Sequence, residues 1–513
     1  MFFYRKISEN DFYYFTKPAA SLSDTELEET AKLFSENYGK YSFNHPDENK
    51  RGKQISLKPS YYKRNMASNE YTYVALAYYK NQLVGQAFYV VEKTENGNAT
   101  WVVQLVVKKE FRRHNIAKRL LFSIWGFSND YAWGLATTNP LTIKTLESAT
   151  LRKVSLKKMQ ENIQVIKQLS EKINFITKDD ISITDSNSIV NSSYYVSHED
   201  IPNFISNYGN NWIFGNLEEG FEWLAFTFRD QELKPISQKD FNNFIEYSEQ
   251  RLIDAYSRMD MENQPWTKHT KEEIIFIEKY IPSNKEITIF DIGCGTGRHL
   301  AELKAHGYNN LYGFDFSQHQ LARASELHPE LTGSLFPDDV RKLKFSKKTD
   351  VILCLYDVIG SFPKIEDNVK IIKSAKKHLK SKGIFICSVM NMELTQSICK
   401  NRFNVYENPK ELFKLKASQI MQQTGNIFNP DTFVIDEKTN LVFRKEIFKG
   451  DGFLDSEYII RDKRYTKNEI ISILEKEGFN ILEARFVRAG KFDLPLEATD
   501  QSAKEILIIA EKK

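Results

Sequence analysis

The sequence has few of the features that mark secreted, membrane-spanning or metal-binding proteins. Among 513 residues there are four cysteines, Cys294, Cys354, Cys387 and Cys399, and none lies in a CxxC pair or at zinc-site spacing. Neither a disulfide framework nor a metal site is therefore indicated, and buried reduced thiols of a cytoplasmic protein are expected. No run approaches the ~20 apolar residues of a membrane span. The N-terminal MFFYRKISENDFYYF carries early charges and lacks the apolar core of a signal peptide.

Net charge is also scarce. The 71 Lys and Arg residues are balanced by 68 Asp and Glu, and the remaining +3 does not predict nucleic-acid binding. The lysines between 370 and 382 recur at helical spacing and predict one solvated face, with a nucleic-acid contact surface as the alternative. Hydrophobic residues make up 41% and charged residues 27%, as in globular proteins. At one domain per ~150 residues the length predicts about three domains, or two large ones.

The first 235 residues mix strand-like and helix-like segments, which predicts an α/β domain. The expected elements are strands at 71–77, 82–91, 101–107, 133–136, 212–215 and 221–228 and a helix at 116–125. Residues 155–175 carry apolar side chains three or four apart and predict one amphipathic surface helix. Residues 178–196 are rich in Asp, Ser, Asn and Thr and predict a loop or linker.

The rest of the chain alternates apolar runs with helical segments, as a doubly wound parallel sheet does. A helical stretch at 239–281 leads into it. Expected strands lie at 288–292, 311–314, 351–355, 384–389, 481–487 and 505–510, with helices near 299–306, 320–327, 368–379 and 466–478. Residues 392–460 interrupt the alternation and predict a β- and loop-rich insert.

A glycine-rich turn follows the first of these strands and precedes a helix. It reads Asp291-Ile-Gly-Cys-Gly-Thr-Gly297-Arg298, and alternate glycines let main chain turn tightly and approach a ligand at a helix N-terminus. Asp315 ends the next strand, where a carboxylate can accept both ribose hydroxyls. Asp338 and Asp339 precede the strand after that and can reach an adenine amino group.

This region resembles the class I S-adenosylmethionine-dependent methyltransferases, whose first motif is written here as DIGCGTGR. The G-x-G-x-G spacing argues against a dinucleotide dehydrogenase, which usually has G-x-G-x-x-G. The resemblance implies a Rossmann-like sheet with S-adenosylmethionine (SAM) as its cofactor. The implied SAM contacts are Asp291, Gly293, Cys294, Gly295, Thr296, Gly297, Asp315, Phe316, Asp338, Asp339 and Leu355.

The same resemblance puts the acceptor beyond the strand that ends near Leu355. Methyl transfer requires alignment more than acid–base chemistry, so Tyr356, Asp357 and Tyr465 are the candidate catalytic or substrate-positioning residues. A turn-capping role for Asp357 is the alternative. The insert, counted to residue 465, is expected to be a substrate lid. Tyr256 and Trp266 either close the cofactor pocket or pack in the core.

A second motif lies in the first domain, where the strand through Leu105, Val106 and Val107 leads into a basic turn and a helix. Helix N–H groups and the guanidinium groups of Arg112 and Arg113 can converge there on a phosphate. The pattern resembles the GNAT acetyltransferases, whose Arg/Gln-x-x-Gly-x-Gly/Ala signature is read here from Arg112 to Ala117. The implied acetyl-CoA contacts are Leu105, Val106, Val107, Arg112, Arg113, His114, Asn115, Ile116, Ala117 and Asn139.

The motif departs from the family at Asn115, which replaces the usual glycine. Asn tolerates left-handed backbone angles better than most residues, so we expect the loop to keep the conformation that it has in the family. No tyrosine acid of the usual kind is visible, and nothing in the sequence places the carboxylates Glu110 or Glu147 at a site. A GNAT fold retained only for binding or docking is therefore the alternative to active acetyl transfer.

Together these patterns predict an α/β protein with a GNAT-like mixed sheet at 1–235, a helical connector at 236–285 and a methyltransferase with its lid at 286–513. The expected function is that of a bifunctional transferase that uses SAM and acetyl-CoA on a small-molecule or peptide acceptor. The alternative is a macromolecule-modifying or defence-associated enzyme in which the GNAT-like domain recognises tRNA or a protein. A cytoplasmic location, no metal and no membrane contact are expected.

Overall fold

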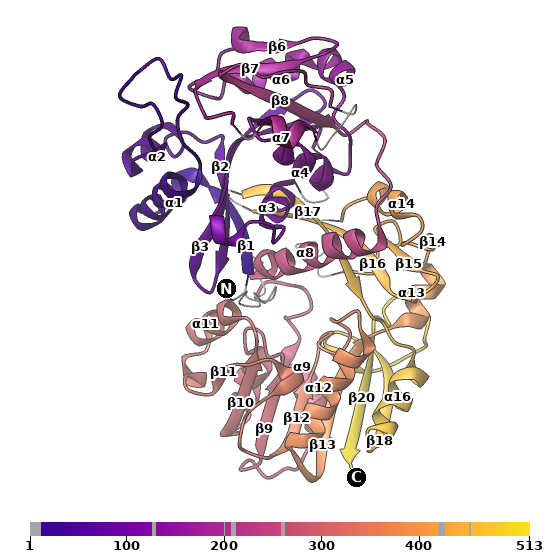
Figure 1. Cartoon of the computed structure of the whole chain (residues 1–513). Coiled ribbons are helices and arrows are strands. Elements are labelled where there is room, and N and C mark those ends of the chain that lie inside the picture. The colour runs from indigo at the N-terminus through magenta and orange to yellow at the C-terminus, as the bar shows by residue number, and fades with distance from the viewer. Residues whose placement is uncertain are drawn as a thin grey trace, which may run out of the picture. The chain divides into compact units, whose positions relative to one another are not determined.

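The computed structural model describes residues 12–125, 130–199, 201–206, 212–257, 262–418, 426–450 and 453–513. The chain divides into two compact units, one comprising Met1–Arg251 with Lys449–Glu457 and the other Leu252–Phe448 with Tyr458–Lys513. Each contains an eight-stranded sheet with helices (Figure 1). No helix in these described ranges is long and apolar enough to span a membrane.

The first unit is built on a mixed sheet of order β1-β2-β3-β4-β5-β8-β7-β6. Every neighbouring pair is antiparallel except β4 and β5, which are parallel. Its strands are β1 Phe12–Pro18, β2 Thr72–Tyr79, β3 Gln82–Thr94, β4 Gly97–Val107, β5 Ala132–Thr137, β6 Ile181–Ile183, β7 Ser188–Tyr194 and β8 Gly220–Phe228. Its helices are α1 Asp24–Asn37, α2 Pro59–Asn65, α3 Ile116–Trp125, α4 Pro140–Thr150, α5 Leu156–Glu161, α6 Ile163–Ser170, α7 Ile201–Ser206 and α8 Gln238–Ser257.

Alternating side chains of this sheet feed two cores. Val74, Leu76 and Phe88 pack with α1 and α2, whereas Ala75 and Ala87 pack with α3, α4 and α6 on the other face. Both faces of the sheet are thus covered, as expected for an α/β domain.

Three details of this unit differ from the sequence prediction. The helix expected at 155–175 is broken at Asn162, whose Oδ1 accepts a hydrogen bond from the Tyr131 hydroxyl and whose backbone leaves the helical region. The loop expected at 178–196 contains β6 and β7, because pairing with β8 provides the burial that this polar sequence lacks. Residues 212–215 form no strand, and the Trp212 indole closes a turn onto the Gly215 carbonyl.

The second unit has the order β11-β10-β9-β12-β13-β20-β18-β19. The strands from β11 to β13 are parallel, and β20, β18 and β19 continue the sheet in antiparallel pairs. They are β9 Thr288–Ile292, β10 Asn310–Asp315, β11 Leu335–Pro337, β12 Thr349–Cys354, β13 Leu379–Met390, β18 Phe479–Arg488, β19 Lys491–Leu496 and β20 Glu505–Lys512. The helices are α9 Thr270–Ile277, α10 Arg298–Ala305, α11 Gln318–Leu327, α12 Ile365–His378 and α16 Lys467–Lys476.

Helices cover both faces of this sheet as well. Phe290 and Ile352 pack with α12 and α16, and the adjacent Ile289 and Leu353 pack with α9 and α10. This confirms the doubly wound sheet. The chain leaves β9 toward β10 on one side, and β12 lies on the other, so the carboxyl end of β9 is the switch point where such folds bind ligands.

The insert between β13 and α16 forms a smaller four-stranded sheet of order β14-β15-β16-β17. Its elements are α13 Met392–Ile398, β14 Arg402–Phe403, α14 Pro409–Lys414, β15 Phe433–Asp436, β16 Val442–Gly450 and β17 Phe453–Asp462. Where β17 ends, Lys463 N donates to the Gly360 carbonyl at 2.9 Å. The insert thereby contacts the loop that follows β12.

Candidate active sites

The glycine-rich turn joins the carboxyl end of β9 to α10. Gly293, Gly295 and Gly297 have φ angles of 79°, 52° and 77°, which glycine adopts without strain. A Cβ at Gly293 would lie 2.4 Å from Val358 Cγ2, whereas one at Gly295 would meet no described atom within 4 Å. Gly295 N donates to Asp315 Oδ2 at 3.0 Å. The turn is thus anchored to the end of β10 and presents open main chain at Gly295.

Asp291 lies at the same switch point and is 2% exposed. Its Oδ2 has no hydrogen-bond partner within the described part of the chain, and His299 Nδ1 lies 4.0 Å from it. Burial raises the pKa of Asp291 to about 7, with the Arg298 guanidinium opposing the rise and the Asp315 carboxylate adding to it. A buried carboxylate oxygen without a partner is costly, so a ligand that carries hydrogen-bond donors fits here.

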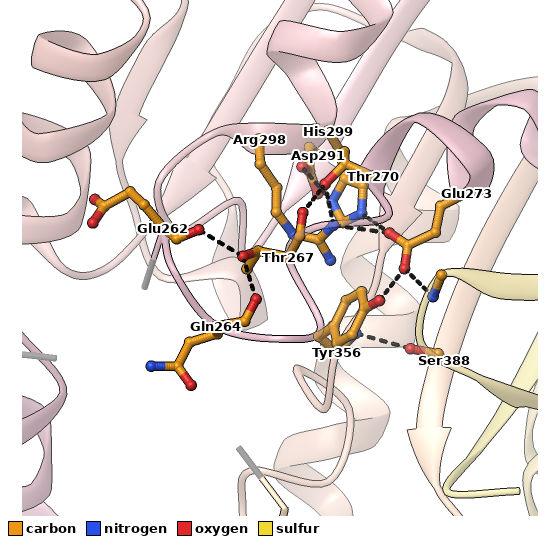
Figure 2. Close-up of polar contacts among 11 residues, drawn as sticks. Glu262, Gln264, Thr267, Thr270, Glu273, Asp291, Arg298, His299, Tyr356 and Ser388 are labelled. Atoms are coloured by element: carbon orange, nitrogen blue, oxygen red, sulfur yellow. Dashed lines mark hydrogen bonds and ion pairs between the residues drawn. The ribbon is translucent and has the colours of Figure 1, made fainter. Parts of the chain in front are cut away.

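Glu273 of α9 connects the elements around this turn and is 0% exposed (Figure 2). Its Oε2 accepts from Arg298 Nη1 at 2.8 Å and from His299 Nε2 at 2.9 Å. Its Oε1 accepts from the Tyr356 hydroxyl and from Gly490 N. Burial alone raises the pKa of Glu273, but these hydrogen bonds and the Arg298 charge outweigh it and hold the pKa at about 2.

Arg298 and His299 are oriented by that carboxylate. Arg298 Nη1 also donates to Thr270 Oγ1 at 2.7 Å, while its buried Nη2 has no partner among the residues described. Burial, together with the Arg298 charge, lowers the pKa of His299 to about 4. The imidazole is therefore neutral, and with Nε2 donating to Glu273 its Nδ1 faces Asp291 as an acceptor. Glu273 was missed by sequence reasoning because no local pattern distinguishes it from the other acidic residues of a helix.

The predicted ribose and adenine carboxylates lie along the same sheet edge. Asp315 accepts from Gly295 N and from Ser317 N at 2.8 Å, and burial raises its pKa against these hydrogen bonds. Asp338 N donates to the Asp315 carbonyl at 3.1 Å, which brings the two aspartates together. Asp339 is paired with the Arg341 guanidinium, and the two Asp338 carboxylate oxygens accept from Asp339 N at 2.8 Å and from Lys344 N at 3.1 Å.

The remaining predicted SAM contacts fall into two groups. Phe316 follows Asp315 and is 61% exposed, which leaves its ring available to stack on a base. Cys294, Thr296 and Leu355 are buried, and the Cys294 sulfur would lie 2.8 Å from a Cβ placed at Gly313. The Cys294 and Leu355 side chains belong to the core that packs with α9 and α10.

Beyond β12, Tyr356 and Asp357 adopt left-handed φ angles of 63° and 64°. Tyr356 N donates to Ser388 Oγ at 2.8 Å, and its ring lies 5.5 Å from that of Trp266. The buried Oδ1 of Asp357 has no partner in the described ranges, so this oxygen does not cap the turn. Tyr465 is 1% exposed and packs in the core. The side chain of Tyr256 lies outside the described residues.

In the first unit, the predicted pyrophosphate loop adopts an unusual backbone. Arg113 and Asn115 have φ angles of 66° and 59°, and the Asn115 carbonyl accepts from Arg119 N at 2.9 Å as α3 begins. Arg112 donates to the carbonyls of Val107 at 3.2 Å and Asn37 at 2.5 Å, and burial lowers the pKa of Arg112. Arg112 thus braces the loop, and both Arg112 and Arg113 are exposed.

The strands next to this loop separate at their carboxyl ends. β4 and β5 pair only from Ala99 with Ala132 to Val102 with Leu135, although both strands continue past the last pair. Of the predicted contacts on β4, Val106 packs in the core with α1 and α2, and Leu105 and Val107 are partly buried. Asn139 Oδ1 accepts from Leu141 N at 3.0 Å and caps α4.

A carboxylate and several tyrosines gather at the point where these strands separate. Glu222 adjoins Trp223, which pairs with Thr137, the last residue of β5. Burial raises the pKa of Glu222 to about 7, and a hydrogen bond from Ser192 opposes this rise. Tyr38 follows Asn37, the residue that Arg112 contacts, and its ring lies 5.8 Å from that of Tyr194. Burial and then the Glu222 charge raise the pKa of Tyr38.

Sequence reasoning missed this acid–tyrosine cluster, which we define as Glu222, Tyr38 and Tyr194. Its members lie in β8, directly after α1 and in β7, and no local pattern connects them. The two carboxylates that the sequence left open have structural partners instead. Glu147 accepts from Lys234 and Val154 N, and Glu110 pairs with Lys108.

Comparison with known proteins identifies both domains. Residues 30–124 match the model of the Acetyltransferase (GNAT) family, and residues 289–383 match the model of a Methyltransferase domain. No curated protein matches the sequence. Similar solved structures include a S-adenosylmethionine-dependent methyltransferase from Clostridium acetobutylicum ATCC 824. The two sequences are 18% identical, the match covers 51% of this chain and 98% of that chain, and the TM-score is 0.35.

Two other solved structures have comparable likeness. The CcbJ methyltransferase from Streptomyces caelestis has 14% identity, covers 48% of this chain and 89% of its own, and has a TM-score of 0.36. The glycopeptide N-methyltransferase MtfA, complexed with SAM, has 12% identity, covers 49% of this chain and 96% of its own, and has a TM-score of 0.30. The family models carry the assignment: this chain contains a GNAT acetyltransferase-family domain followed by a methyltransferase domain.

Proposed function

We propose that the methyltransferase domain uses SAM and binds the amino-acid end of that cofactor at Asp291, Arg298 and His299. The observation that carries this proposal is a pair of opposite, buried and unused polar atoms at the switch point, Asp291 Oδ2 and Arg298 Nη2, each without a partner in the described structure. A carboxylate and a guanidinium match an ammonium and a carboxylate respectively. His299 Nδ1 adds a second acceptor for the ammonium.

The other groups of the site fit the rest of that cofactor. Gly295 leaves room for close approach, Asp315 can accept from ribose hydroxyls, and Asp338 and Phe316 can hold the base. When bound, SAM supplies an electrophilic methyl group. The chain's own contribution is alignment and the exclusion of water, and the Glu273 hydrogen bonds keep Arg298, His299 and Tyr356 in fixed positions before any ligand arrives.

Isothermal titration of the full chain with SAM tests this proposal. We expect one binding event for each chain. No binding by the folded protein would contradict the proposal. A titration with acetyl-CoA on the same preparation then shows whether the second domain has its own cofactor.

We infer that the GNAT domain binds acetyl-CoA between the separated ends of β4 and β5 and transfers the acetyl group. The left-handed Asn115, the start of α3 and the exposed Arg113 support a pyrophosphate site. The acid–tyrosine cluster adjoins the same opening and supplies a carboxylate that can take a proton at neutral pH. Glu222 would accept the proton that an amine acceptor loses, and Tyr38 would donate one to the departing thiolate.

Glu222→Gln tests this role. CoA release from acetyl-CoA is measured with ethanolamine, which is protonated at pH 7, and with hydroxylamine, which is largely unprotonated. We expect Glu222→Gln to slow the ethanolamine reaction by about 10²-fold or more and the hydroxylamine reaction much less. Glu218→Gln, an exposed neighbour, is the matched control. Equal losses with both nucleophiles would exclude deprotonation of the ammonium as the role of Glu222.

We propose that both domains act on a small-molecule or peptide acceptor, as a bifunctional transferase. Lysines of the 370–382 run are partly neutralised, because Lys370 pairs with Asp367, Lys373 with Glu477 and Lys380 with Asp350. This pairing does not favour a polyanion surface. A salt-dependent mobility shift of the full chain with RNA would instead support the macromolecular alternative.

A further inference from the structure

The carboxyl edge of the second sheet carries a row of acidic side chains that extends past the proposed cofactor site. In sheet order, Asp315 ends β10, Asp291 lies in β9, Asp357 follows β12, and Glu505 begins β20 on the far side of β13. The first two belong to the cofactor site. Asp357 and Glu505 lie toward the other side of the switch point and have no role there.

Glu505 is 4% exposed and is paired in register with Met390 of β13. The Ser388 hydroxyl hydrogen-bonds one carboxylate oxygen, but Oε2 has no partner anywhere in the described chain. Burial raises the pKa of Glu505 to about 7, the nearby Glu273 adds to the rise, and Arg298 and Lys504 oppose it. The Lys504 ammonium itself donates to Asn426 Oδ1 at 2.9 Å.

Asp357 approaches the same place from β12. Ser388 Oγ accepts from the peptide N–H of Tyr356 (Figure 2). Because the same hydroxyl hydrogen-bonds Glu505, one serine connects the Tyr356–Asp357 loop to Glu505. The Gly360 turn is closed over the carboxylate, since a Cβ at Gly360 would lie 2.5 Å from Asp357 Oδ1. Burial raises the pKa of Asp357 well above its usual range, and Asp462 and Glu505 add to this rise.

The cationic side chains nearest to Asp357 form hydrogen bonds and ion pairs with other residues. Arg464 is 0% exposed and donates to Asp462 at 2.7 Å, to Thr395 at 2.9 Å and to the Ile427 carbonyl at 3.0 Å. Arg444 donates to Asp462 at 2.8 Å and pairs with Glu446. These two arginines are thus paired with Asp462 and Glu446, and none of these hydrogen bonds goes to Asp357 or Glu505.

We propose that Asp357 and Glu505 form an acceptor subsite of the methyltransferase domain and that the acceptor presents an amine to it. The inference rests on the proposed methyl transfer. Two carboxylates that each keep a buried oxygen without a hydrogen-bond partner in the described chain match a ligand that brings positive charge and N–H donors. A hydroxyl acceptor offers one hydrogen-bond donor and no charge. Most of the free-energy cost of burying carboxylate oxygens without partners would therefore remain.

The same pair can complete the chemistry. The amine gives one proton to Asp357 or Glu505, its freed lone pair bonds to the methyl carbon of SAM, and the C–S bond breaks with its electrons left on sulfur. The products are the N-methylated amine and S-adenosylhomocysteine, and the carboxyl group returns its proton to water. No further reactant is needed.

A first test needs no ligand, because unused buried carboxylates lower stability. We expect Glu505→Gln and Asp357→Asn to raise the melting temperature of the full chain by about 2 °C or more at pH 8 and by clearly less at pH 5. Each of these carboxyl groups has a higher pKa in the folded chain than in the unfolded chain. Between these two pKa values, a rising pH therefore lowers the free energy of unfolding of the wild type, and the amide variants do not have this loss. Glu511→Gln, at the other end of β20, is the matched control. Lower melting temperatures at both pH values would mean a structural role and overturn the proposal.

The second test uses methylammonium chloride as the probe on the full chain saturated with S-adenosylhomocysteine, with sodium chloride and methanol as controls. We expect methylammonium to raise the melting temperature above both controls, with an apparent affinity at least tenfold weaker in Glu505→Gln. The same response in wild type and variant would overturn the amine assignment. Failure of S-adenosylhomocysteine to bind would contradict the proposed methyl transfer instead, and the first test would still decide on the carboxylates.

Discussion

The two candidate cofactor sites share a plan and differ in charge. Each places a turn with left-handed residues between a strand and the N-terminus of a helix, at Gly293–Gly297 before α10 and at Arg113–Asn115 before α3. The methyltransferase turn is surrounded by buried carboxylates, which suit a cofactor that carries positive charge. The GNAT turn presents exposed Arg113 and a braced Arg112, which suit phosphates. The two turns thus share a backbone conformation and differ in side-chain charge, which suits them to the oppositely charged cofactors that we propose.

The largest effect is expected when a carboxylate is placed in the methyltransferase turn. Gly295→Asp adds a negative charge beside Asp315 and occupies the open space, so SAM affinity should fall about a thousandfold or more while acetyl-CoA binding stays unchanged. Calorimetry with each cofactor measures this. Gly333→Asp is the control, because Gly333 also has a positive φ and open space around it but lies outside the turn. Retained SAM binding by Gly295→Asp would remove this turn from the site.

Removing the charge of Glu273 should affect only the methyltransferase half. Glu273→Gln leaves buried Arg298 without its carboxylate, which we expect to cost about 3 kcal/mol of stability and to weaken SAM binding. Urea unfolding and calorimetry give the two values. Glu272→Gln, on the exposed side of α9, should change neither. A variant with normal stability would show that Glu273 does not organise the site.

A smaller effect should distinguish the sites by pH. The Asp291 pKa of about 7 is raised, so the ionised form that binds an ammonium is depleted below that pH. SAM affinity should therefore fall about fifteenfold between pH 7 and pH 5.5. Calorimetry at three pH values checks the slope, and Asp291→Asn should bind weakly with a flat profile. A flat profile in the wild type would mean that Asp291 is not a ligand.

The smallest effect is expected at the GNAT turn. Arg113 is exposed, so its contribution to phosphate binding is screened by solvent, and Arg113→Ala should weaken acetyl-CoA binding about fivefold and less at high salt. Titrations at two salt concentrations measure this. Lys109→Ala, also exposed and outside the turn, is the control. A loss that does not depend on salt would point to a change in the loop and not to a lost charge contact.

Much of the fold could be predicted from periodicity and turn chemistry. The strands around Asp291 and Asp315 and helix 116–125 were located within a few residues because burial and amphipathic spacing act locally. The split at Asn162 and the strands within 178–196 could not be predicted, because a contact from Tyr131 ends the helix and pairing with β8 creates the strands. Secondary-structure propensities are local and carry no information about such distant partners.

The candidate sites divide in the same way. The sequence alone determined the two turns, because glycine spacing and a basic turn before a helix are local patterns with a physical meaning. Only the tertiary structure decided which charges serve them: Glu273 beneath Arg298, the Glu222 cluster at the separated strands, and the unused oxygens of Asp291, Asp357 and Glu505. The free energy of an ionised side chain depends on its burial and on its hydrogen-bond and ion-pair partners. Both are set by residues that are distant in the chain.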